Sequence, residues 1–143
     1  MPKDLTAQAS ATVNAPAEKV WDALVTPATI KKYMFGSTVT SDWKKGSPIT
    51  FKGEWQGKAY EDKGVILDAQ PKRLLAYTHY SPLTGLPDKP ENYHTVRIAL
   101  APKGNETVVT LTQDNNANEQ ERAHSQKNWE MMLASLKKVL ESS

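Results

Sequence analysis

Cysteine is absent from the 143 residues of the chain. Thiolate nucleophiles, zinc sites built on thiolates and disulfide scaffolding are therefore excluded, and the absence fits a reducing compartment. No apolar run reaches the roughly eighteen residues that a membrane helix needs, and Met1–Leu5 lacks the apolar segment of a signal peptide. We therefore expect a cytoplasmic protein without a membrane span.

A strong charge of either sign is also missing. Eighteen lysines and arginines oppose sixteen aspartates and glutamates, which gives a formal net charge of +2. The basic residues are scattered in short pairs such as Lys31-Lys32 and Lys44-Lys45. Such pairs are typical of solvated surface rather than of a nucleic-acid-binding patch, so we predict no nucleic-acid partner.

Residues for metal or phosphate chemistry are sparse. The three histidines, His79, His94 and His124, lack a spacing such as His-x-x-x-His that would place two of them on one helix face. The sequence also contains no glycine-rich phosphate loop. We therefore predict neither a metal nor a cofactor.

Nucleophiles and acid–base pairs are equally hard to find. Ser81 and Ser125 stand outside the Gly-x-Ser-x-Gly context of a nucleophile elbow. Glu61 and Asp62 offer carboxylates, but a single acid of this kind is more often solvated than catalytic, and no paired general acid and base is visible. The sequence therefore leans against an enzyme.

Most of the chain follows the pattern of β-strands. Apolar and polar residues alternate with a period of two, as in Leu5–Val13 and Pro48–Trp55, and prolines and glycines separate the segments. The predicted strands cover residues 5–13, 38–40, 48–55, 58–69, 74–80, 93–100 and 107–114. The sequence contains no repeat and no linker, so we predict a single domain over residues 1–143.

Two short helices are predicted between the first two strands. Pro16 suits the first position of a helix over residues 16–25, because its fixed φ already matches helical geometry. Thr26-Pro27 repeats this signal, and Ile30 and Tyr33 follow at helical spacing.

A long helix closes the chain. Asn118 followed by Glu121 is typical of a helix start with a capping box. From Trp129 onward, apolar residues recur at helical spacing and predict a buried stripe. The stripe consists of Trp129, Met132, Leu133, Leu136 and Leu140. The same face carries Arg122 and Ser125 in its first turns, so we expect a hollow between the sheet and the first half of this helix.

The alternation also predicts which strand residues face the helix. This inner face comprises Ile49, Phe51, Trp55, Leu75, Tyr77, His79, His94, Val96, Ile98, Leu100, Val109, Leu111 and Gln113. His79, His94 and Gln113 share the end of the sheet that meets the polar turns of the helix. Each alone is more commonly an ordinary strand-end residue. On an inner face they need water or a ligand to satisfy them, and together they indicate a small-molecule site.

The loop over residues 81–91 contains Pro82, Pro87, Pro90 and Gly85, too many breakers for a regular element. Connections of this length inside a compact domain often serve as lids or binding surfaces. We interpret it either as a gate at the pocket mouth or as a plain decorated hairpin.

The order of a strand, two short helices, six strands and a long helix resembles the helix-grip fold of the START-related superfamily, which includes polyketide cyclases and birch-pollen-allergen-like proteins. The resemblance is carried by Val13–Leu24, Trp43–Phe51, Gly64–Tyr77 and Asn128-Trp129. These segments are similar to the branch related to the C-terminal domain of the activator of the ninety-kilodalton heat-shock chaperone ATPase. The resemblance implies an α+β fold in which an antiparallel sheet of about seven strands wraps around the C-terminal helix.

The resemblance leaves three functions open, because members of this superfamily bind lipids, hormones or polyketides and a few are enzymes. The first is non-catalytic binding of a small apolar molecule or lipid between sheet and helix. The second is a cyclase or hydrolase with His79 or His94 as base. The third is a protein-binding domain like the chaperone activator, with an unidentified partner. The residues predicted to contact a ligand are Phe51, Trp55, Tyr77, His79, His94, Gln113, Trp129, Met132 and Leu133.

Overall fold

The structure is a computed structural model that describes residues 5–34, 36–55, 57–81, 87–116 and 118–141, with the side chain of Trp55 outside the description. The described elements, in chain order, are β1 (Leu5–Val13), α1 (Ala17–Val25), α2 (Pro27–Tyr33), β2 (Thr38–Ser41), β3 (Pro48–Trp55), β4 (Lys58–Gln70), β5 (Leu74–His79), the 3-10 helix η2 (Pro90–Asn92), β6 (His94–Lys103), β7 (Glu106–Asn116) and α3 (Glu119–Glu141). Within the described residues, no helix is both long and apolar enough to cross a membrane.

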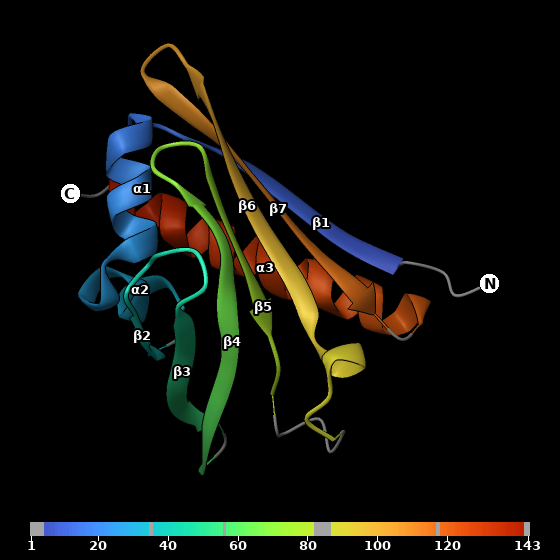
Figure 1. The fold of residues 1–143 in the computed structure, drawn as a ribbon. Coiled ribbons are helices and arrows are strands. Elements are labelled where there is room, and N and C mark those ends of the chain that lie inside the picture. The colour runs from blue at the N-terminus through green and yellow to red at the C-terminus, as the bar shows by residue number, and fades with distance from the viewer. Residues whose placement is uncertain (1–4, 35, 56, 82–86, 117, 142–143) are drawn as a thin grey trace.

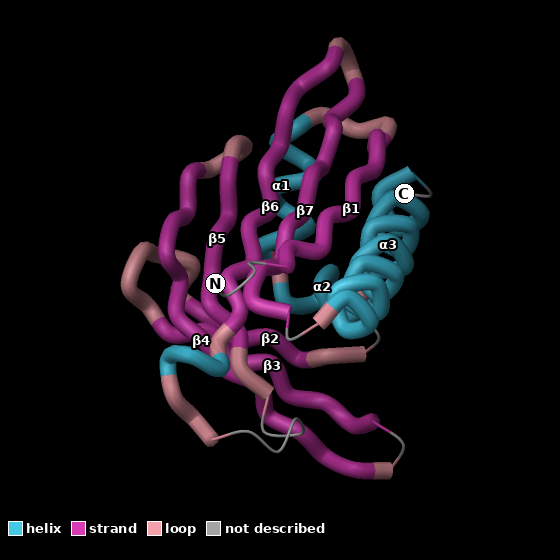
Figure 2. Tube along the Cα trace, turned by 90° about the vertical axis from the view of Figure 1, so that its right-hand side faces the viewer, coloured by secondary structure: helices cyan, strands magenta, loops and turns pink. Residues whose placement is uncertain are grey.

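The strands form one open antiparallel sheet in the order β1-β7-β6-β5-β4-β3-β2. In this order β1 and β2 are the edge strands, and β1, the first strand of the chain, lies next to β7, the last (Figure 1). Figure 2 shows α3 running beside β1, with β2 and β3 turned across the lower part of the view. This arrangement confirms the predicted α+β helix-grip fold.

The alternation of the sequence sets which side of the sheet is buried. Leu75 in β5 lies opposite Ile98 in β6, and Ile98 lies opposite Leu111 in β7. All three side chains are buried, because residues paired across strands share one face and this face looks toward the helices. The predicted inner-face register is therefore confirmed through the centre of the sheet.

The two short helices fill one end of the space above the sheet. Pro16 precedes α1, and Pro27 begins α2, as their fixed φ angles favour. Ile30 and Tyr33 of α2 are buried, and the Tyr33 hydroxyl donates a hydrogen bond to the carbonyl oxygen of Ala23 at 2.9 Å. This bond joins α2 to α1, and both helices contact α3.

The long helix α3 begins and packs as the sequence predicts. The Asn118 side-chain oxygen accepts a hydrogen bond from the backbone N–H of Glu121 at 2.8 Å. The apolar stripe packs against the core: Met132, Leu133 and Leu136 are buried, and the flanking Trp129 and Leu140 are partly buried.

Two details differ from the sequence prediction. The strand predicted over residues 93–100 continues as β6 through Lys103, because β6 and β7 pair along a hairpin that extends beyond the rest of the sheet (Figure 1). The turn uses Gly104, whose φ of +62° is a conformation that glycine adopts without strain. The loop expected to have no regular element contains the short 3-10 helix η2 after Lys89.

Replacing Leu136 with alanine is expected to lower the free energy of unfolding by about 2–5 kcal/mol, because the change leaves a cavity in a packed core. Met131→Ala is the matched control on the same helix, since Met131 is 52% exposed. This control should change the free energy by less than about 0.5 kcal/mol. Urea unfolding of both variants measures the two losses, and equally small losses would contradict the buried stripe.

Candidate ligand-binding site

Two adjoining pockets lie between the sheet and the first half of α3. The sheet-side pocket has a volume of about 530 Å³ and the helix-side pocket about 390 Å³. The sheet-side pocket is lined by Met34, Ser37, Phe51, Tyr60, Asp62, Tyr77, His79, Ser81, His124, Asn128 and Trp129. The helix-side pocket is lined by Met34, Asp62, Gln113, Ser125, Asn128, Trp129, Met131 and Met132. Met34, Asp62, Asn128 and Trp129 line both pockets, so the two lie side by side and are together called the hollow. Each volume falls in the range of small-molecule sites.

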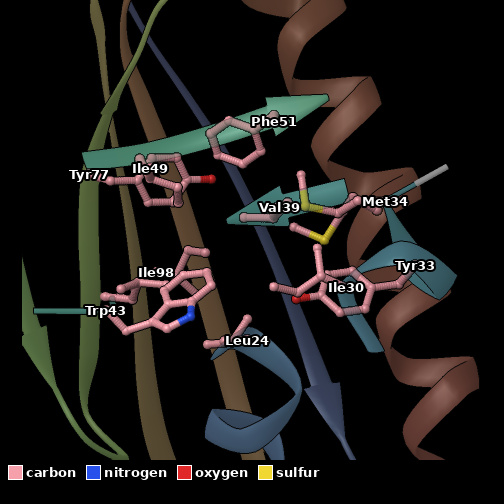
Figure 3. Close-up of a pocket in the computed structure, with 12 residues that line it drawn as sticks. Leu24, Ile30, Tyr33, Met34, Val39, Trp43, Ile49, Phe51, Tyr77 and Ile98 are labelled. Atoms are coloured by element: carbon pink, nitrogen blue, oxygen red, sulfur yellow. The ribbon is translucent and has the colours of Figure 1, made fainter. Parts of the chain in front are cut away.

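The floor of this hollow is closely packed. A cavity of about 20 Å³ lies beneath it, which is room for one water molecule at most. Figure 3 shows the side chains around this cavity, with Trp43 at one side and Met34 at the other. Phe51 and Tyr77 line both this cavity and the sheet-side pocket. The larger pocket therefore stands on an apolar floor that continues into the core.

A carboxylate and an imidazole meet in the wall of the sheet-side pocket. His79 Nε2 lies 3.0 Å from Asp62 Oδ2, in a pair whose side chains are 27% and 15% exposed. The His79 ring also packs edge-on against Phe51, with 5.3 Å between ring centroids. Asp62 Oδ1 is buried and has no hydrogen-bond partner among the described residues. The pocket thus contains a carboxylate with one oxygen bonded to His79 and one oxygen that has no donor in the described part of the chain.

A glycine brings this pair together. A Cβ atom on Gly64 would lie only 1.6 Å from the carbonyl oxygen of Thr78, the residue before His79. The backbones of β4 and β5 approach so closely here that no other residue fits. Asp62 lies two residues before Gly64, on the same face of β4, so the close approach brings Asp62 and His79 within hydrogen-bonding distance.

A second glycine shapes the opposite wall. Gly53 of β3 pairs with Tyr60 of β4, and a Cβ on Gly53 would lie 2.5 Å from the Tyr60 hydroxyl oxygen. The Tyr60 ring therefore lies across the space that a side chain at position 53 would fill. Its hydroxyl is 2.6 Å from Ser37 Oγ, which ties the wall to the segment before β2.

Polar contacts hold the first half of α3 to the sheet. Trp129 Nε1 donates a hydrogen bond to Gln113 Oε1, and Ser125 Oγ donates to Asn116 Oδ1 at 3.0 Å. Asn116 Nδ2 in turn donates to the carbonyl oxygen of Leu5 at 2.8 Å. Gln113 was expected to need water or a ligand as a partner, but its oxygen is bonded to Trp129 within the protein.

The predicted ligand residues divide into three groups. Phe51, Tyr77, His79, Gln113, Trp129 and Met132 line the two pockets. Neither His94 nor Leu133 is among the described lining residues: His94 Nδ1 donates to the Asp114 carbonyl oxygen at 2.9 Å, and Leu133 is buried in the core. The side chain of Trp55 lies outside the described part of the structure. Binding at all nine positions stays a prediction.

Sequence reasoning missed several pocket residues, among them Tyr60, Asp62 and Asn128. Asp62 was interpreted as a solvated acid, yet it lines both pockets. The signal was available, because counting back by twos from the buried Ile66 places Asp62 and Tyr60 on the inner face of β4. Asn128 lies one position before Trp129, and a helix stripe alone does not show that this flank meets a pocket.

The described end of the loop over residues 81–91 is tied to the sheet. Asp88 pairs with Lys63 of β4 and accepts a hydrogen bond from the Tyr93 hydroxyl. The Tyr93 ring stacks on Tyr80 with 5.2 Å between centroids. Residues 82–86 lie outside the described residues, so the role of this loop as a gate stays a prediction.

Few of the described groups that line the two pockets are ionisable. Burial raises the pKa of the Tyr77 hydroxyl far above its ordinary value, so this wall residue stays neutral. Among the described residues, no group of three histidine, cysteine, aspartate or glutamate side chains is placed to hold a metal ion. The binding capacity of the hollow therefore comes from apolar surface, hydrogen bonds and the Asp62 carboxylate.

Comparison with known families and structures gives a consistent result. The model of the family described as Activator of Hsp90 ATPase homolog 1-like protein matches residues 14–141. Comparison with curated proteins finds no match. The solution structure of ChR145 from Cytophaga hutchinsonii is 58% identical, with a TM-score of 0.87 and coverage of 99% of this chain and 97% of that chain.

Two more distant structures share the fold. The Aha1 dimer of Colwellia psychrerythraea is 22% identical, with a TM-score of 0.74 over 95% of this chain and 96% of that chain. DynU16, a protein of the dynemicin biosynthetic locus, is 18% identical, with a TM-score of 0.79 over 98% of this chain and 48% of that chain. The predicted helix-grip superfamily, with its chaperone-activator branch, is confirmed.

The Asp88 carboxyl is expected to titrate below the ordinary aspartate range. Hydrogen bonds from the Lys63 ammonium and then the Tyr93 hydroxyl lower its pKa. Because the folded-state pKa is lowered, the contribution to stability is present above the unfolded-state pKa and is lost as the pH falls through the folded one. NMR titration should show a higher Asp88 pKa in Lys63→Met and no change in Lys58→Met, a control on the same strand. An unchanged pKa in Lys63→Met would contradict the ion pair.

Proposed function

The chain belongs to the Activator of Hsp90 ATPase homolog 1-like family, and we propose that this member binds a small, mostly apolar molecule or lipid between its sheet and α3. The ligand lies in the hollow formed by the sheet-side and helix-side pockets. The apolar body of the ligand contacts Phe51, Trp129 and Met132. A few polar groups of the pocket form hydrogen bonds with the rest of the ligand.

One observation carries this proposal: the pair of adjoining pockets under the first half of α3. Their volumes of about 530 and 390 Å³ fall in the range of small-molecule sites. The lining combines aromatic and methionine side chains with a small number of convergent polar groups, the composition typical of ligand sites. Methionines such as Met34 and Met132 adapt their shape readily, which suits a wall that closes on a flexible ligand.

Asn128 offers a way to fill the pocket without disturbing the core. It is exposed, and it lines both the sheet-side and the helix-side pocket. Asn128→Trp is expected to weaken saturable binding of N-phenyl-1-naphthylamine, a neutral fluorescent probe, by about tenfold or more, because the indole occupies apolar contact area of the probe. Fluorescence titration measures the affinity.

Lys127→Trp is the matched control for this experiment. Lys127 is also exposed on α3 but is not among the described residues that line either pocket. The control should bind the probe as the unmodified protein does, with a similar melting temperature in both variants. Equal affinities for the probe in the two tryptophan variants would place the binding site elsewhere, and a protein-binding role like that of the chaperone activator would then become the stronger candidate.

A second candidate function is a cyclase or hydrolase with His79 as general base. The hydrogen bond to Asp62 Oδ2 favours this reading, because a carboxylate that accepts the Nε2–H fixes the imidazole tautomer and leaves Nδ1 as the basic atom. His94 supports catalysis less, since its Nδ1 already bonds to the Asp114 carbonyl oxygen.

Ester hydrolysis with 4-nitrophenyl butyrate tests the catalytic candidate. If His79 is the general base, His79→Gln should lower the turnover rate at least about a hundredfold. A loss of this size lies within the usual contribution of general base catalysis. The same variant should still bind the neutral probe saturably. Turnover that survives in His79→Gln, or no turnover above buffer, speaks against a His79 base for ester hydrolysis and leaves the binding proposal unchanged.

A further inference from the structure

Apart from its two histidines, the described lining of the pocket carries charge of one sign. Asp62 is the only carboxylate among the described residues that line the sheet-side and helix-side pockets, and no lysine or arginine is among them. The remaining polar lining residues are neutral amides and hydroxyls, together with His79 and His124. The Asp62 side chain is only 15% exposed, and a carboxylate so shielded, with no lysine or arginine among the described lining residues, favours a cationic neighbour and opposes an anionic one.

Aromatic rings line the same pocket as this carboxylate. Phe51, Tyr60, Tyr77 and Trp129 all line the sheet-side pocket with Asp62. The faces of such rings carry partial negative charge and attract cations, and indole is the strongest of them. Burial of Tyr77 keeps its hydroxyl neutral. The combination of one carboxylate with several rings is a favourable environment for an organic ammonium group.

The hydrogen bonds of Asp62 leave room for such a group. Oδ2 is bonded to His79 Nε2, while Oδ1 is shielded from solvent and has no donor among the described residues. A buried acceptor without a donor costs about 1–3 kcal/mol. The torsion that orients a carboxylate is soft, so a ligand N–H in the pocket can reach one of the oxygens without a change in the backbone.

We infer that the pocket binds an organic cation, a primary or secondary amine that carries an apolar body. The ammonium group lies against Asp62 and donates a hydrogen bond to its carboxylate. The apolar body lies along Met34, Phe51 and Trp129. This inference rests on the proposed function and adds the charge of the ligand. Fatty acids and other carboxylates of the same size as the amine bind weakly, because Asp62 repels them.

Three probes of equal chain length test the charge preference. Octylamine, octanol and octanoate share one apolar tail and differ in head group, so their affinities separate tail binding from charge recognition. Isothermal titration calorimetry at neutral pH should show octylamine binding about tenfold or more tightly than octanol, the effect of a desolvated cation among rings and a carboxylate. Octanoate should bind more weakly than octanol.

Two variants locate the preference at Asp62. Asp62→Asn keeps the shape of the side chain and removes its charge, so octylamine should lose its advantage over octanol. Glu61→Gln is the matched control, since Glu61 is the adjacent residue of β4 and is exposed. This control removes the same charge but should keep the full preference. Circular dichroism and melting temperature establish that both variants are folded.

The outcomes distinguish the cation inference from the proposal of an apolar ligand. Octanol or octanoate binding as tightly as octylamine to the unmodified protein overturns the cation assignment, and this comparison does not depend on any variant. A preference for octylamine that persists in Asp62→Asn also overturns it. In both cases saturable binding of octanol leaves the apolar-ligand proposal standing. Failure of all three probes to bind contradicts the proposed function and the cation inference together.

Discussion

The packing of the second half of α3 is the contact on which the rest of the structure depends. Met132, Leu133 and Leu136 have little or no exposed surface, and they share one core with the inner face of the sheet and with α1 and α2. Because a helix is stiff over this length, fixing its second half also fixes the direction of the first half. The first half of α3 then continues beside the sheet (Figure 2). Residues of both line the two pockets between them.

Polar contacts set the depth of that space. An apolar stripe along the whole of α3 would draw the helix down onto the sheet and close the hollow. Instead, Ser125 bonds to Asn116 and Trp129 bonds to Gln113, both near the end of β7. Hydrogen bonds have defined lengths and directions, so they hold the helix to one edge of the sheet without requiring close packing over its centre. The region over β3, β4 and β5 stays open because the helix is held at β7 and β1.

The fold was predictable from local patterns, and the polar site was not. Period-two alternation placed Phe51 and Tyr77 on the inner face, because strand geometry alone decides the side on which a residue lies. The Asp62–His79 pair depends on how closely two strands approach at Gly64, which is a property of the folded sheet. The same limit applies to His94: its face followed from the pattern, but its bond to the Asp114 carbonyl oxygen depends on how β6 and β7 end.

The pairing of Asp62 with His79 is used in both candidate functions, ligand binding and general base catalysis. A carboxylate has about four lone-pair sites on two oxygens, so a bond to His79 Nε2 leaves capacity for a ligand donor. In a catalytic site the carboxylate orients the imidazole, and the imidazole acts on the substrate. In a binding site the imidazole orients the carboxylate, and the carboxylate meets the ligand. The buried Oδ1 has no donor among the described residues, and this fits the second arrangement, because a ligand donor that bonds the carboxylate after it turns offsets the desolvation of that oxygen.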